Sequence, residues 1–101
     1  MAKIYISGQI TGNLIYKQLF AQAESALKAQ GHTVINPAVE TEGLTQRDYM
    51  RISLARLESA DFIYMLPGWE YSKGAQIERM YAEYIGIVVA KGDLTENEQN
   101  A

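Results

Sequence analysis

Hydrophobic and polar positions along this chain predict four short strands that alternate with three helices. Runs of β-branched and aromatic residues that end at glycine or proline predict strands at residues 3–7, 33–35, 61–66 and 87–90. Apolar residues spaced three or four apart predict helices at residues 13–30, 45–59 and 72–85. Such alternation is typical of an α/β fold in which helices cover both faces of a parallel sheet.

Each predicted helix has an apolar or small-residue stripe and a recognisable end. The stripes are formed by Tyr16, Phe20, Ala23 and Leu27 in the first helix, by Met50, Leu54 and Leu57 in the second, and by Ile77, Tyr81 and Tyr84 in the third. Gly31 and Gly86 are placed to end the first and third helices. Thr45 with Asp48 resembles a capping box, and Ser72 is placed to cap the third helix. We expect the second helix to face the sheet with its stripe.

The element order predicts a three-layer sandwich of the Rossmann or flavodoxin-like kind, with a short parallel sheet in the strand order 2-1-3-4. In such sheets ligands bind beyond the carboxyl ends of the strands, where the chain reverses direction. Residues 1–91 are expected to form a single domain, and residues 92–101 a solvated tail. The 101 residues leave no room for a second domain.

Composition removes several classes of function. The net charge of -3 argues against a nucleic-acid polymer as partner, because such proteins grip phosphates with excess lysine and arginine. With no cysteine and only His32, the chain lacks the residues of thiolate and histidine metal sites. A metal site in this chain would therefore need carboxylates alone. The apolar runs are too short for a membrane span and no leader precedes them, so we expect a cytoplasmic protein without a membrane partner.

Three loops converge at the expected ligand crevice, at residues 8–12, 36–37 and 67–74. Gly8 and Gly12 allow the backbone to approach a ligand closely, and Ser72 stands at a helix amino terminus, which suits an anion or a sugar. Tight turning alone also explains these glycines. Trp69 is placed to stack on a nucleobase, although a tryptophan that closes the core is an equal alternative.

Glu78 is the carboxylate that the helical register singles out. It shares a helix face with Ala75, Ala82 and Ile85 rather than with a polar stripe. The alternative is a partly exposed glutamate paired with lysine or arginine. Tyr5 lies in the first strand, where either a core position or a hydroxyl at the crevice fits the pattern.

Segments 4–12, 34–37 and 66–78 resemble the small phage and bacterial proteins of the DUF4406 family. That family is similar to the nucleoside 2-deoxyribosyltransferases and the 2′-deoxynucleoside 5′-phosphate N-hydrolases, so the resemblance implies their fold and glycosyl chemistry. It implies Glu78 as the nucleophile, Tyr5 as an active-site tyrosine, no cofactor, and a homodimer or larger oligomer. The candidate substrate-binding residues are Gly8, Gln9, Ile10, Thr11, Gly12, Asn36, Ser53, Trp69, Ser72 and Gly74.

The sequence departs from these enzymes at two positions. Ser53 stands where they carry an aspartate, so either Asp48 or Glu70 supplies the second carboxyl group of a retaining mechanism or turnover is impaired. Thr11 stands where the monophosphate hydrolases carry an arginine, which weakens the expectation of a phosphate preference. Lys73 is placed to compensate in part.

Three hypotheses follow. The first is a hydrolase or transferase that acts on the N-glycosidic bond of a small (deoxy)nucleoside or nucleotide through Glu78, in phage or prophage nucleotide metabolism. The second is a nucleotide-binding module that kept the pocket and lost the catalytic acid, with Ser53 as its mark. The third is a structural domain that dimerises.

Overall fold

The computed structural model describes residues 2–10, 12–39 and 43–91. The strands are β1 (Lys3–Ser7), β2 (Thr33–Ile35), β3 (Phe62–Met65) and β4 (Val88–Lys91), and the helices are α1 (Tyr16–Ala29), α2 (Gln46–Leu57) and α3 (Lys73–Ile85). Two short 3-10 helices, η1 (Pro37–Val39) and η2 (Trp69–Tyr71), follow β2 and β3. Thr11 and the tail expected at residues 92–101 lie outside the described residues.

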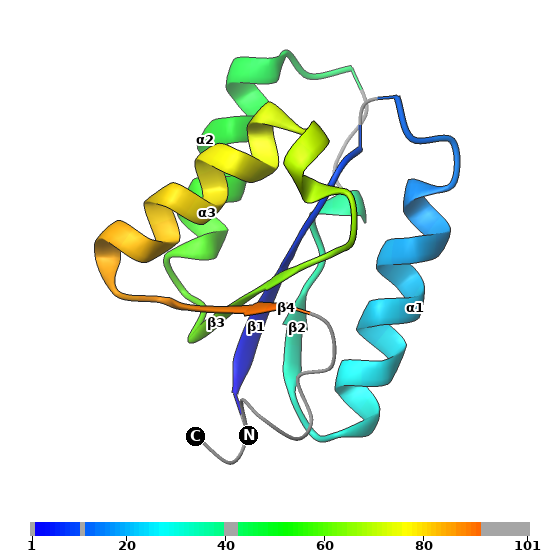
Figure 1. The fold of residues 1–101 in the computed structure, drawn as a ribbon, viewed down its shortest axis with the longest axis vertical. Coiled ribbons are helices and arrows are strands. Elements are labelled where there is room, and N and C mark those ends of the chain that lie inside the picture. Colours follow the sequence, from blue (N-terminus) through cyan, green and yellow to red (C-terminus); the bar gives the residue numbers. More distant parts are fainter. Residues whose placement is uncertain (1, 11, 40–42, 92–101) are drawn as a thin grey trace.

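The four strands form one parallel sheet in the order β2-β1-β3-β4, which confirms the predicted topology (Figure 1). In its register, Tyr5 of β1 lies beside Ile35 of β2 and Ile63 of β3. The chain therefore places β1 between its two neighbours, and the carboxyl end of β1 lies at the reversal point where such sheets bind ligands.

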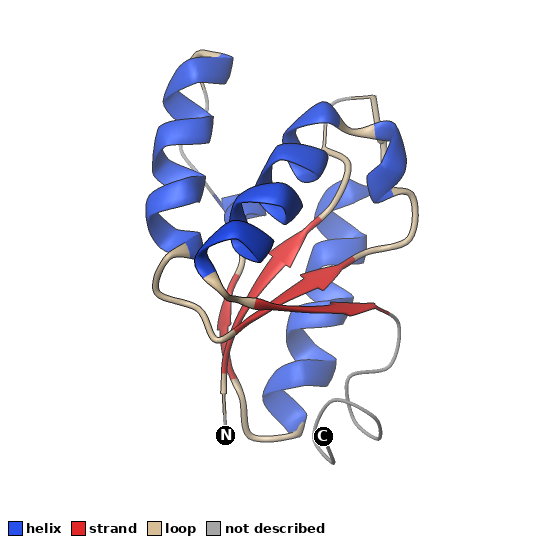
Figure 2. Ribbon diagram, turned by 60° about the vertical axis from the view of Figure 1, so that its left-hand side comes forward, coloured by secondary structure: helices blue, strands red, loops and turns tan. Residues whose placement is uncertain are grey.

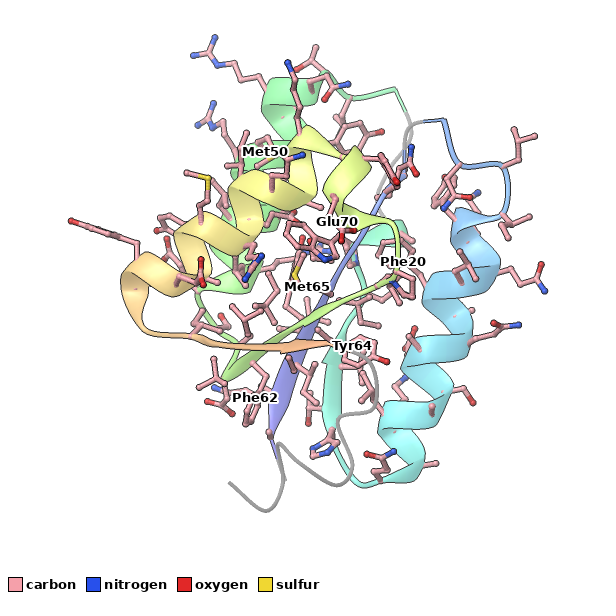
Figure 3. The ribbon with its side chains drawn as sticks, in the orientation of Figure 1. Phe20, Met50, Phe62, Tyr64, Met65 and Glu70 are labelled. Carbon is pink, nitrogen blue, oxygen red and sulfur yellow. The ribbon has the colours of Figure 1, made fainter. Side chains whose placement is uncertain are left out.

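Helices cover both faces of the sheet, with α1 on one side and α2 and α3 on the other (Figure 2). Successive strand residues point to opposite faces. Ile4 and Ile6 therefore pack with Phe20 of α1, whereas Tyr5 packs with Met65 on the side of α2 and α3. Phe20 and Met65 are labelled in Figure 3. All five residues are almost fully buried. This alternation decides which β1 side chains face the site.

The apolar stripe of α1 behaves as predicted and that of α2 does so in part, whereas only Tyr81 of the predicted α3 stripe packs against the core. Phe20 and Leu27 of α1 are buried, and so is Leu57 of α2. In α3 the buried residues are instead Ala75, Glu78 and Ala82. Ile77, on the predicted stripe, is 47% exposed and Tyr84 is 90% exposed. Small alanines let α3 lie close to the sheet, so its larger apolar residues point outward.

Several boundaries differ from the prediction because side chains or turns use the terminal backbone groups. The first helix begins at Tyr16, since the Asn13 side chain instead donates a hydrogen bond to the Gln9 carbonyl (3.2 Å). The last strand begins one residue late, because the Ile87 N–H donates to the Ala82 carbonyl at the end of α3 (2.8 Å).

The predicted caps of α2 and α3 are confirmed. Thr45 and Asp48 form a reciprocal capping box. Ser72 Oγ accepts the Ala75 N–H at 3.1 Å, and Gly86 ends α3 in the left-handed conformation with φ of 89°. Within the described part of the chain, no helix is long and apolar enough to cross a bilayer.

Candidate functional site

The carboxylate of Glu78 lies on the buried face of α3, directly over the end of β1. Its side chain is only 8% exposed. Tyr5 Oη donates a hydrogen bond to Glu78 Oε2 at 2.8 Å, and Ser7 Oγ donates to Oε1 at 2.6 Å. Both hydroxyl residues are fully buried. Each carboxylate oxygen therefore has a fixed partner, which holds the group in one orientation.

The alternation of β1 explains why two hydroxyls reach the same carboxylate. Tyr5 and Ser7 are two residues apart, so both point to the α3 face of the sheet. Gly8 follows at once, and a Cβ there would lie 3.0 Å from the Leu66 Cβ. The glycine therefore lets the end of β1 approach the end of β3, and the first loop leaves the sheet beside Glu78.

Burial and hydrogen bonding act in opposite directions on Glu78. Burial is the larger effect and raises the pKa of its carboxyl group, while hydrogen bonds from Ser7 and Tyr5 partly offset it. Burial first, and then the neighbouring Glu78 charge, raise the pKa of Tyr5 well above its ordinary value. The phenol therefore keeps its proton and acts as a hydrogen-bond donor to the carboxylate.

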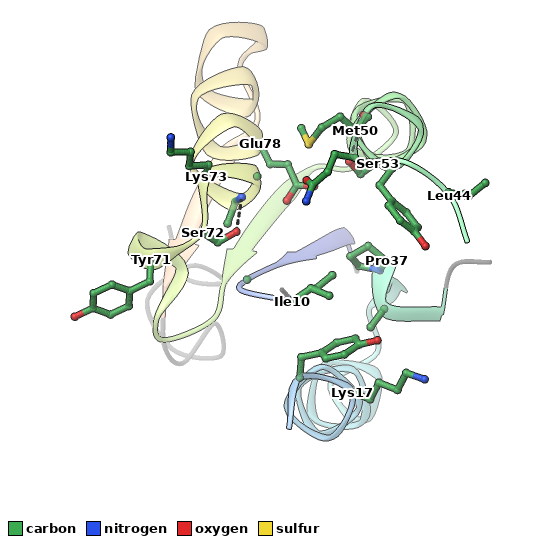
Figure 4. A pocket seen from close by; sticks show the side chains of 17 residues that line it. Ile10, Lys17, Pro37, Leu44, Met50, Ser53, Tyr71, Ser72, Lys73 and Glu78 are labelled. Atoms are coloured by element: carbon green, nitrogen blue, oxygen red, sulfur yellow. Dashed lines mark hydrogen bonds between the residues drawn. The ribbon is translucent and has the colours of Figure 1, made fainter. Parts of the chain in front are cut away.

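Glu78 lines a cavity of about 670 Å³ at the carboxyl ends of the strands (Figure 4). This volume lies in the range typical of small-molecule sites. The other lining residues come from the first loop, η1, η2, α1, α2 with the residue before its cap, and the start of α3. They are Gly8, Ile10, Tyr16, Lys17, Pro37, Ala38, Leu44, Gln46, Tyr49, Met50, Ser53, Tyr71, Ser72, Lys73, Gly74 and Ala75. The wall is thus mixed, with an apolar side around Ile10, Pro37 and Met50 and a polar side at the start of α3.

The structure brings half of the predicted substrate-binding residues to this cavity together with Glu78. They are Gly8, Ile10, Ser53, Ser72 and Gly74. Tyr5 lies beneath the cavity and reaches it through its hydrogen bond to Glu78. Thr11 lies outside the described residues, so its predicted role stays a prediction.

Gln9, Gly12 and Asn36 do not line the cavity. Gly12 has a left-handed φ of 81° and serves the turn. The Asn36 side chain donates to Glu24 Oε1 and accepts from the Ala38 N–H, both at 2.9 Å. It thereby fixes η1, whose Pro37 and Ala38 do line the cavity. The contribution of Asn36 is therefore to hold this part of the wall.

The expectation that Trp69 stacks on a ligand in this cavity is not met by its position. The ring packs against the core beneath α3, and the Arg79 guanidinium lies 4.7 Å from its centroid. It faces a separate shallow hollow that Met80 and Glu83 also line. A cation–π contact with Arg79 occupies the ring face that a base would need.

Sequence reasoning missed Ser7, Tyr49 and Met50 as site residues. The signal for Ser7 was present, because it lies two positions after Tyr5 in the same strand. Met50 was assigned to the sheet-facing stripe of α2, although it lines the cavity three residues before Ser53. The apolar stripe of α2 therefore faces the cavity at its start, near Met50, and faces the core at its end, near Leu57.

Neither predicted substitute for the second carboxyl group reaches the cavity. The Asp48 carboxylate is used in the capping box of α2, where hydrogen bonds from Thr45 lower its pKa. Glu70 is exposed and lines the hollow beside Trp69. Among the residues that the structure describes, Glu78 is the only carboxylate that lines the cavity. The same residues contain no cluster of three or more acidic or histidine side chains that suits a metal ion.

Comparison with known proteins agrees with this fold. A 2-deoxyribosyltransferase from Bacillus psychrosaccharolyticus is similar in structure, with a TM-score of 0.73 and 24% sequence identity over 95% of this chain and 75% of that chain. No curated protein matches the sequence. The family model of DUF4406, described as a domain of unknown function, matches residues 2–91. This chain is therefore a member of the DUF4406 family, built on the fold that is also found in a 2-deoxyribosyltransferase.

Proposed function

We propose that this protein cleaves or exchanges the N-glycosidic bond of a small nucleoside or nucleotide, with Glu78 as the nucleophile. One observation carries the proposal. A carboxylate held by two buried hydroxyls borders a cavity of nucleoside size at the carboxyl ends of a parallel sheet. The similar fold of a 2-deoxyribosyltransferase supports the same chemistry by analogy.

In the proposed reaction a Glu78 oxygen attacks C1′ of the bound sugar. The bond between C1′ and the base nitrogen breaks, its electron pair goes to that nitrogen, and a glycosyl ester of Glu78 forms. Water then attacks C1′, the ester bond breaks, and the Glu78 carboxylate is restored while a water proton passes to solvent. Another base in place of water gives transfer. Two successive inversions retain the configuration at C1′.

The hydroxyls of Tyr5 and Ser7 orient the carboxylate for this attack. Each donates to a different oxygen, so the side chain cannot rotate freely, while each oxygen keeps a second lone pair. Ser72 and Gly74 line the cavity at the start of α3, and a helix amino terminus suits the oxygens of a sugar or its phosphate. The apolar side of the cavity suits the base.

The direct test is base release from a panel of nucleosides and 5′-monophosphates that covers both sugars, the common bases and quaternary bases. Wild-type protein is expected to release free base, and Glu78→Ala and Glu78→Gln to lose at least about 100-fold of that activity. Release that survives in both variants would reject Glu78 as the nucleophile. No release from any member of the panel would reject the enzymatic proposal.

A second candidate function is a nucleotide-binding module without turnover. The observation that favours it is Ser53, which borders the cavity where the related enzymes carry an acid. Calorimetric titration with the same panel distinguishes the two candidates. A binder gives saturable heat without base release, whereas a purely structural domain gives no saturable heat.

We also propose that the chain forms a homo-oligomer through the outer face of α3. Ile77, Met80 and Tyr84 lie on that face and are 47%, 68% and 90% exposed. Light scattering after size exclusion is expected to give a mass above that of one chain, and Met80→Lys to lower it. A wild-type monomer at all concentrations would contradict this oligomer.

We also propose that the glycosidic activity serves nucleotide metabolism in the cytoplasm, in a phage or prophage setting.

A further inference from the structure

The surroundings of Glu78 bear on which leaving groups the site can expel, a question that rests on the proposed function. Departure of an ordinary neutral base is assisted by an acid that protonates it, usually a second carboxyl group. Among the described residues, the groups next to Glu78 are the hydroxyls of Tyr5, Ser7 and Ser53, and no second carboxyl group lines the cavity.

The hydrogen bonds of these hydroxyls point away from a leaving base. Tyr5 and Ser7 donate to the two oxygens of Glu78, at 2.8 Å and 2.6 Å. Ser53 Oγ donates to the Met50 carbonyl oxygen at 3.3 Å. Burial also raises the pKa of the Tyr5 phenol, which makes it a weaker acid still. These groups therefore stabilise the carboxylate and do not supply a proton at neutral pH.

The charge at the site also favours a substrate whose base does not need a proton to leave. The carboxylate of Glu78 is 8% exposed, and its hydrogen-bond partners are the neutral hydroxyls just described. Lys17 and Lys73 are exposed side chains at the cavity edge that extend away from Glu78 in Figure 4. A negative charge in a largely desolvated wall attracts a cation strongly. Tyr49 in the same wall adds an aromatic ring that suits a cation.

We infer that the preferred substrates are N-glycosides whose base carries a fixed positive charge, such as N-alkylated purine or pyridinium nucleosides and nucleotides. When C1′ bonds to a Glu78 oxygen, the electron pair of the C1′–N bond neutralises the charged nitrogen. The base departs neutral and needs no proton. Hydrolysis of the ester by water then releases one proton per turnover, whereas hydrolysis of a neutral nucleoside releases none.

The test compares N7-methylguanosine with guanosine in both the ribose and the deoxyribose series, at a pH acidic enough to keep the N1 proton of the methylated base. Under that condition the two compounds differ by one methyl group and a positive charge. Nicotinamide riboside serves as a second cationic probe. Each rate is divided by the spontaneous rate of the same compound, because charged bases also leave faster without a protein. We expect an acceleration at least about 10-fold greater for the charged member of each pair, with one proton released per turnover.

Introducing an acid at the cavity gives a second, independent readout. Ser53→Asp places a carboxyl group beside Glu78 and is expected to raise turnover of neutral guanosine by about 10-fold or more, since general acids contribute about 100- to 10,000-fold at best. Ser53→Ala removes the hydroxyl without adding an acid, and no such gain is expected. Circular dichroism of both variants verifies that they fold.

The outcomes separate this inference from the proposed function. Equal accelerations for the charged and neutral members, with loss of both in Glu78→Ala, would overturn the substrate preference and leave the glycosidic activity standing. No Glu78-dependent release from either member would overturn both. A greater acceleration for the charged member than for the neutral member in the wild type supports the inference, provided that the difference between the two accelerations becomes smaller in Ser53→Asp.

Discussion

At the scale of single residues, the account depends on how a buried carboxylate is held at the edge of a cavity. Glu78 is desolvated by α3 and the sheet, and hydrogen bonds from Tyr5 and Ser7 compensate only part of that cost. A desolvated carboxylate of this kind lowers the stability of the fold, but it also holds a nucleophile in a fixed position. Two predictions concern this cluster alone.

Replacing Ser7 by alanine removes one of the two donors to Glu78 and leaves the rest of the cavity intact. We expect kcat to fall by about 10-fold with KM nearly unchanged, because the hydroxyl orients the nucleophile and does not line the cavity. Steady-state kinetics on the best substrate of the panel checks this. Ser7→Thr keeps a hydroxyl and is the matched control, and an equal loss in that variant would point to packing instead.

The stability of the protein relative to Glu78→Gln is expected to fall as the pH rises. The folded protein holds the Glu78 proton more tightly than the unfolded chain, so the stabilisation is complete below the ordinary glutamate pKa and disappears above the raised pKa. Each tenfold change in the acid constant corresponds to about 1.4 kcal/mol. Urea unfolding of both proteins across the acidic range measures the difference. A difference that grows with pH would contradict the assigned shift.

At the scale of elements, the start of α3 joins the sheet to the cavity. Ser72 caps this helix through the Ala75 N–H and also borders the cavity, whereas Thr45 caps α2 and does not border it. The two caps therefore make a matched pair. The Ser72 cap is expected to affect both the stability of the fold and ligand binding, and the Thr45 cap to affect stability alone.

Ser72→Ala and Thr45→Ala are each expected to lower the free energy of unfolding by about 1 kcal/mol, the usual value of such a cap. Only Ser72→Ala should also weaken ligand binding measured by titration calorimetry, by about 3- to 10-fold for one lost hydrogen bond. Equal losses of affinity in both variants would mean that Ser72 acts through general stability.

The sequence predicted the elements well where local signals and the core agree. The caps at Thr45 and Ser72 and the stripe that buries Phe20 are local patterns, and all are present in the structure. The buried face of α3 was harder to predict. Large apolar residues usually mark the buried face of a helix, but α3 packs on the sheet through its small alanines. Ile77 and Tyr84 face outward for that reason. Only the distance between α3 and the sheet decides between the two faces.

At the scale of the whole molecule, the strand order brings β1 and α3 together although they are some seventy residues apart in the chain. The alternation of elements predicted this topology and therefore the place of the site. It could not predict that Trp69 lies beneath Arg79 or that Asp48 is used in a cap. Those outcomes depend on side-chain partners that are distant or compete locally.

Because the site is assembled by the global fold, a core change at a residue that does not line the cavity should act on stability first. Leu57→Ala removes a fully buried side chain between α2 and the sheet and is expected to cost about 2–5 kcal/mol. Leu14→Ala, at a position that is 99% exposed, is the matched control and should cost less than about 0.5 kcal/mol. Urea unfolding measures both. A small cost at Leu57 would contradict the described packing.

Detection of a covalent intermediate is the measurement that decides whether Glu78 is the nucleophile. The protein is quenched with acid during turnover of its best substrate and digested, and the peptides are analysed by mass spectrometry. The account predicts a glycosyl adduct on Glu78 in the wild type and none in Glu78→Gln. An adduct on another residue, or rapid turnover with inversion of configuration at C1′, would contradict the role given to this carboxylate.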